Sequence, residues 1–113
     1  MGETDGTRAD LVSDLEARAR WRRQRADKYP NDERETRSAA ALVDAARAVA
    51  ELAADDPRLM RLASFYAGAS DGAVLSFLEA QNRIMSRHGY DDDAPTPEGL
   101  LAALVASADK ATA

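Results

Sequence analysis

A tract of basic side chains in the first third of the sequence is the strongest candidate for chemistry in this chain. Between positions 18 and 28 it holds five arginines and one lysine against a single aspartate, with Trp21 among them. The cations are Arg18, Arg20, Arg22, Arg23, Arg25 and Lys28. The whole chain carries a net charge of −5, so the residues outside this tract carry −10. Arginine suits two-point contacts to phosphate or carboxylate, and the tract therefore predicts an anionic partner.

Within this tract we select five candidate partner or phosphate contacts: Arg18, Trp21, Arg22, Arg25 and Lys28. At helical spacing, three of the cations share the side of the helix on which the indole points, which places an aromatic anchor beside them. A second interpretation stays open. The tract can be a solvated helix face whose arginines pair with acids of the next helix, and a run of charge more often has this role.

Other residue types give little support to catalysis or to cofactor binding. The chain has no cysteine, which excludes disulfides, thiolate zinc sites and a cysteine nucleophile. Its single histidine, His88, directly precedes a glycine and is typical of a helix end. The acidic run 91–93 lacks the alternating oxygen ligands and closing glutamate of a calcium loop. We expect no enzyme activity, no cofactor and no metal.

The elements that must position these residues are all expected to be helices. Apolar residues recur at intervals of three and four, and no stretch alternates as a strand would. Capping signals divide the chain, for example Asp56 followed by Pro57, and Gly89 after a cationic turn. We predict one domain over residues 1–113, an all-α bundle of four to five helices with short loops. The expected helices cover about 7–28, 32–54, 57–67, 71–88 and 97–111, with residues 1–6 frayed.

Two of these helices carry unusual patterns. In the first, Arg22 falls on the apolar face with Leu11 and Leu15, which is a local conflict. In the second, small and large apolar residues alternate along a heptad seam that admits close approach of another helix. The residues of this seam are Leu42, Ala46, Val49 and Ala53. Leu, Ile, Val and Phe make up only 19 of 113 residues, and such a thin core predicts that the seam packs on a second copy.

These observations favour a non-enzymatic helical module that regulates through protein–protein contact and associates with itself, as a homodimer or larger oligomer, or with another protein. The basic helix of one copy would meet the acidic loop 91–93 or the N-terminal acids of another. Two alternatives stay open. One is a nucleic-acid-associated regulator that uses Arg18–Lys28, although the acidic surplus of the chain makes nucleic acid a poor partner. The other is an acidic inhibitor that imitates nucleic acid.

The sequence also predicts where in the cell the protein is located. Residues 1–10 contain no apolar run, so we expect no signal peptide. The longest apolar run, residues 100–106, is far too short to span a bilayer. Together with the absence of cysteine, this predicts a cytoplasmic protein without a membrane partner. The motifs identify no known family.

Overall fold

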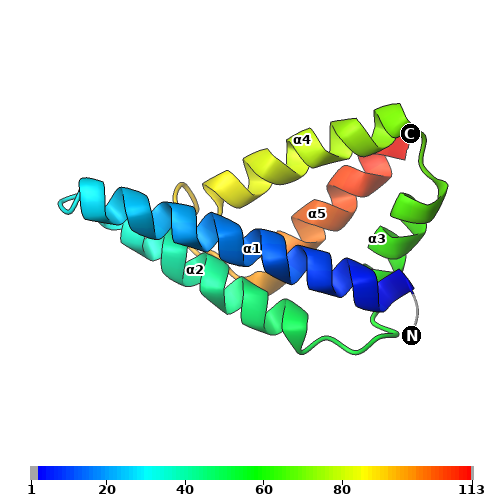
Figure 1. Cartoon of the computed structure of the whole chain (residues 1–113), viewed down its shortest axis with the longest axis horizontal. Helices are drawn as coiled ribbons and strands as arrows, with labels where there is room; N and C mark the ends of the chain where they lie inside the picture. Colours follow the sequence, from blue (N-terminus) through cyan, green and yellow to red (C-terminus); the bar gives the residue numbers. More distant parts are fainter. Residues whose placement is uncertain (1–2, 113) are drawn as a thin grey trace.

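Residues 3–112, the part of the chain that the computed structural model describes, form five α-helices joined by turns and loops (Figure 1). No strand occurs in that range. The helices are α1 (Glu3–Lys28), α2 (Glu33–Ala50), α3 (Pro57–Gly68), α4 (Asp71–Arg87) and α5 (Pro97–Thr112). The predicted all-α bundle is confirmed.

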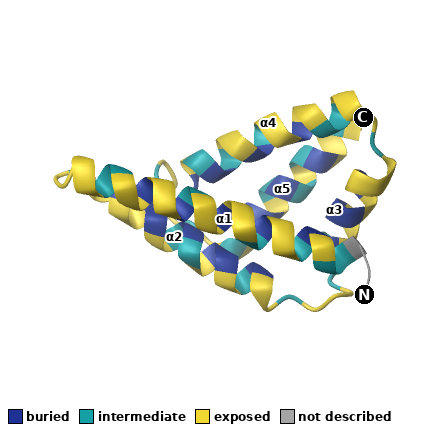
Figure 2. Ribbon diagram, viewed as in Figure 1, coloured by how far each residue is buried: buried dark blue, intermediate teal, exposed yellow. Residues whose placement is uncertain are grey.

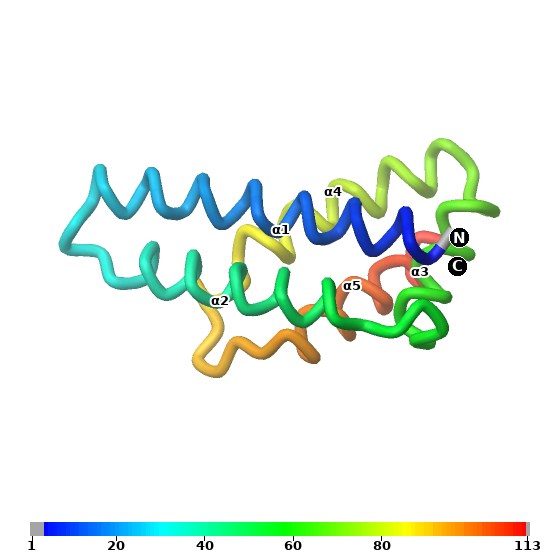
Figure 3. The backbone as a smooth tube through the Cα atoms, turned by 60° about the horizontal axis from the view of Figure 1, so that its bottom comes forward, coloured from blue at the N-terminus to red at the C-terminus, as the bar shows by residue number. Residues whose placement is uncertain are grey.

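Helices α1 and α2 form a long antiparallel hairpin that follows the longest dimension of the molecule (Figure 1). The molecule measures 44 × 28 × 21 Å. The turn at residues 29–32 lies at one end of the long axis and α3 lies at the other, while α5 runs from the middle of the molecule toward the α3 end (Figures 1 and 3). Helix α4 runs in the same direction as α1, and the two helices converge toward their C-terminal ends. Helix α5 packs against α2, α3 and α4, which closes the bundle beneath α1.

Local capping chemistry sets most helix starts where the sequence predicts them. The Asp32 carboxylate accepts from the Arg34 amide, Asp56 caps α3 ahead of Pro57, and Ser70 caps α4.

Two helix boundaries differ from the expectation. Helix α1 begins at Glu3, so residues 3–6 are helical rather than frayed, while residues 1–2 lie outside the described range. Arg8 explains this early start, because it pairs with Asp5 at 2.6 Å and donates to the Leu52 carbonyl. Helix α2 ends at Ala50 instead of residue 54, and the Leu52 carbonyl accepts from Arg8 in place of a further helical turn.

The predicted seam of α2 is covered by the chain itself (Figure 2). Leu42, Ala46 and Val49 are buried, and they belong to one core cluster with Leu11 and Leu15 of α1. Alanines on both helices let the two backbones approach closely, so the hairpin fills its own interior. Ala53 is exposed beyond the end of α2. The prediction of contact with a second copy is therefore wrong for Leu42, Ala46 and Val49, which the chain itself covers.

The C-terminal end of α4 is clamped onto α2 at Gly89. This glycine has φ +73°, and a Cβ there would lie 2.7 Å from Ala41 Cβ and 2.9 Å from Ser38 Cα. Ser38 Oγ donates to the His88 carbonyl at 2.7 Å, and Arg37 Nε donates to the Gly89 carbonyl at 2.6 Å. Both the left-handed backbone and the close approach require glycine at this position.

Gly89→Ala tests this clamp. We expect the free energy of unfolding to fall by about 1–3 kcal/mol, because the methyl group is strained by φ and collides with α2. Urea denaturation monitored by circular dichroism measures the change. Gly72→Ala is the matched control, since nothing lies within 4 Å of a Cβ at that helical position. An equal effect of the two substitutions would contradict this account.

Candidate functional site

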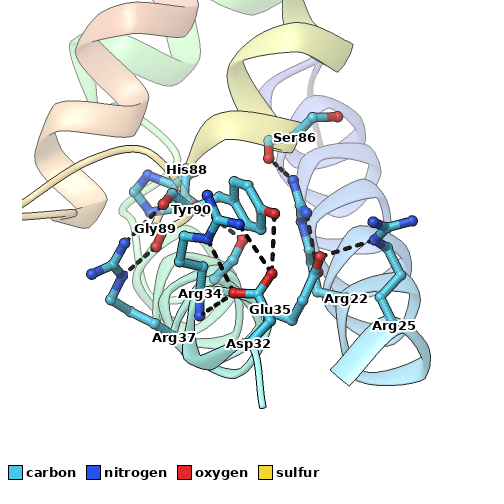
Figure 4. Close-up of polar contacts among 11 residues, drawn as sticks. Arg22, Arg25, Asp32, Arg34, Glu35, Arg37, Ser86, His88, Gly89 and Tyr90 are labelled. Carbon is cyan, nitrogen blue, oxygen red and sulfur yellow. Dashed lines mark hydrogen bonds and ion pairs between the residues drawn. The ribbon is translucent and has the colours of Figure 1, made fainter. Parts of the chain in front are cut away.

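A buried carboxylate held by two arginines joins α1, α2 and the end of α4 (Figure 4). Glu35 is completely buried, and its two oxygens accept from Arg22 Nη1 at 3.1 Å and from Arg25 Nε at 3.0 Å. The other Arg22 terminal nitrogen donates to the Ser86 carbonyl near the C-terminus of α4. This resolves the conflict on the apolar face of α1, because Arg22 meets a buried acid there.

Aromatic rings complete the surroundings of this ion pair. The Arg22 guanidinium carbon lies 4.7 Å from the centre of the Trp21 ring and 4.3 Å from that of Tyr90. Arg34 lies over the Tyr90 ring as well, at 4.6 Å, and the Tyr90 hydroxyl lies 3.4 Å from Asp32 Oδ2. Cation–π contact strengthens when it is desolvated, so the loop after α4 is held to the α1–α2 turn.

The predicted contacts therefore divide into separate environments. Arg22 is only 5% exposed, so the prediction that it contacts an external partner is wrong. Arg25 is bound to Glu35 through Nε, and its side chain is 40% exposed. Lys28 is exposed at the end of α1, with its amine 5.8 Å from the Tyr29 ring centre. Arg18 and Trp21 lie together at a groove between α1 and α4. The Trp21 ring joins the two environments, since the Arg22 and Arg25 guanidinium carbons also lie 4.7 and 5.1 Å from its centre.

This groove, with a volume of about 390 Å³, is the candidate functional site. Its lining residues are Asp14, Ala17, Arg18, Trp21, Leu78, Gln81, Asn82 and Met85. Arg18 donates to Asn82 Oδ1 and lies 5.2 Å from the Trp21 ring centre, so it bridges the two helices. Trp21 is 39% exposed and Leu78 43% exposed, which leaves an apolar rim facing solvent.

An exposed acidic group of α1 lines the groove. Gln81 is buried, and its Nε2 donates to Asp14 Oδ2 at 3.4 Å. Burial raises the pKa of Asp14 and the neighbouring Asp10 adds to the rise, while the bond from Gln81 opposes it. The groove thus combines an apolar rim with amide, carboxylate and guanidinium groups, a set that suits recognition of a polypeptide surface.

Two sets of important residues escaped the sequence reasoning. Glu35 lies three residues after the cap Asp32, where a glutamate is common at any helix start, so its position alone does not mark it. The signal was the arginine on the apolar face of α1, which requires a buried acid opposite it. Leu75 and Leu78 of α4 are 60% and 43% exposed, and apolar periodicity alone did not distinguish them from core residues.

The acidic loop is engaged within its own chain. Asp91 Oδ2 lies 3.6 Å from Arg87 Nε, and Asp92 Oδ2 lies 3.9 Å from His88 Nδ1. Both contacts are between residues four apart in the sequence, and both carboxylates remain more than half exposed.

Comparison with known proteins gives no match: no family model, no curated protein and no solved structure matches this chain. Within residues 3–112, no group of three or more histidine, cysteine, aspartate or glutamate side chains could hold a metal ion. In the same range no helix has both the length and the apolar character needed to cross a bilayer.

Glu35→Gln tests the buried ion pair. Removing the charge leaves Arg22 buried without its counter-ion, so we expect a loss of about 3–5 kcal/mol in the free energy of unfolding. Chemical denaturation provides the measurement. Asp109→Asn is the control, because its pair with Arg61 is more than half exposed on both sides and contributes less than about 1 kcal/mol. Equal losses for the two variants would refute the special role of Glu35.

His88 supplies a pH dependence. Burial lowers the pKa of His88 from its usual 6.5, and Asp92 and the backbone of Ala41 oppose the shift only in part. The unfolded chain then binds more protons between the folded pKa and about 6.5, so stability falls as pH decreases through that window. Proton NMR of the single imidazole measures the folded pKa, and His88→Gln removes this part of the pH dependence. A folded pKa above 6.5 would contradict this prediction.

Proposed function

We propose that this chain is a non-enzymatic, regulatory protein–protein interaction module that associates with itself in the cytoplasm. The observation that carries the proposal is the apolar rim of the α1–α4 groove, formed by Trp21 and Leu78, which are 39% and 43% exposed on neighbouring helices. Leu75, three residues before Leu78 on α4, is a further exposed apolar side chain at 60%. Contiguous exposed apolar side chains with polar neighbours mark interaction sites, and tryptophan is enriched among the residues that dominate binding energy.

The geometry favours a protein ligand over a small molecule. The rim follows two neighbouring helices that run in the same direction (Figure 1), and such an edge accepts the apolar face of another helix. A second copy is the occupant we propose, because a chain this short buries a modest fraction of its surface and gains from covering the rim symmetrically.

The nucleic-acid alternative receives less support from the same residues. Arg22 and Arg25 are bound to Glu35, and Arg18 donates to Asn82. These three guanidinium groups are therefore already engaged by the protein, and the net charge of −5 opposes approach to phosphate. We therefore favour protein contact over nucleic-acid binding for this surface.

Self-association is measured by sedimentation equilibrium over a wide concentration range. We expect the mass to rise above that of the monomer, and Leu78→Glu to raise the dissociation constant at least about tenfold by placing a charge on the apolar rim. Met60→Glu is the matched control, since Met60 is 49% exposed on α3, away from the groove. A monomeric mass at every concentration, or equal effects of both variants, would refute the proposed surface.

A further inference from the structure

A row of six exposed side chains runs along the flank of α1 that borders the groove. Its members are Asp10, Asp14, Ala17, Trp21, Gln24 and Lys28, and all six are exposed. The intervals between them alternate between four and three residues, which is the spacing of a helix–helix contact seam. The buried ion pair does not use this row, because Arg22 and the core residues of α1 lie on the adjacent strip of the helix.

The row is complementary to itself when its direction is reversed. In an antiparallel arrangement centred at the level of residue 19, residue 10 of one copy lies opposite residue 28 of the other, residue 14 opposite residue 24, and residue 17 opposite residue 21. The outer pair joins the carboxylate of Asp10 to the ammonium of Lys28. The next pair joins the acceptor oxygens of Asp14 to the amide of Gln24. The inner pair sets Trp21 against Ala17, a large side chain against a small one.

We propose that α1 packs antiparallel against α1 of a second copy in this register, about a two-fold axis at the level of Ala19. The proposal rests on the self-association proposed above and specifies its geometry. Two-fold symmetry makes every contact occur twice, so the interface gains two ion pairs, two amide–carboxylate contacts and two buried indoles. A parallel arrangement would instead oppose Asp10 to Asp10 and Lys28 to Lys28, which is repulsive.

The surroundings of the row suit this register. Ala17, Trp21 and Leu78 all line the groove, so the indole of the partner that covers Ala17 also reaches the apolar rim of α4. Arg18 flanks the proposed axis, and its bond to Asn82 directs its charge toward α4 rather than toward the second copy. The segment from residue 10 to residue 28 spans roughly 27 Å of helix, long enough for a continuous contact along both copies.

Charge exchange between the two ends of the row tests the register. We expect Asp10→Lys and Lys28→Asp each to raise the dimer dissociation constant about tenfold, because two attractive pairs become repulsive. The two variants mixed together restore both pairs, so they form heterodimers in preference to either homodimer. The double variant, which carries both changes in one chain, recovers the wild-type constant. Sedimentation equilibrium gives the constants, and native mass spectrometry counts the heterodimers.

Glu16→Lys and Arg23→Asp are the matched controls, since both residues are exposed on α1 outside the row and undergo the same changes of charge. Circular dichroism verifies that each variant folds. A wild-type chain that stays monomeric overturns both the self-association and this register. A wild-type dimer whose row and control variants weaken equally, or whose mixed variants show no preference for each other, overturns the register alone.

Discussion

The buried carboxylate of Glu35 is the group on which the arrangement of three helices depends. A charge removed from water is costly unless it is paired and hydrogen-bonded, and Glu35 is completely buried. Arg22 and Arg25 of α1 satisfy both of its oxygens, and Arg22 also binds the Ser86 carbonyl. Helix α4 must therefore end beside α1, and this convergence forms the inner end of the groove.

The direction of Arg22 also determines what α1 presents to solvent. Successive residues of a helix point about 100° apart, so Trp21 is turned out to the rim when Arg22 faces Glu35. Asp14 and Ala17 lie on the same flank and line the groove with the indole. The residues that neutralise the buried acid and those of the proposed contact surface thus lie on neighbouring strips of α1.

Close packing of alanine explains how so few large apolar residues sustain the fold. Ala19 on α1 and Ala45 on α2 are completely buried, and leucines from all helices except α4 fill the remaining space. Because the hairpin covers its own seam, the large apolar side chains left at the surface lie on α1, α3 and α4 and in the turn after α1. Those of α1 and α4 meet at the groove, so we place the proposed contact with a second copy there and not on α2.

The positions of the helices follow from local sequence, since caps such as Asp32 and Asp56 and the terminating Gly89 act within a few residues of their position in the chain. The sequence also indicated that Trp21 and the neighbouring cations form a candidate contact surface. The element that each helix face packs against depended on tertiary contacts. Periodicity shows that a face is apolar or charged but not what covers it, so the seam of α2 and the destination of Arg22 depended on residues distant in the sequence.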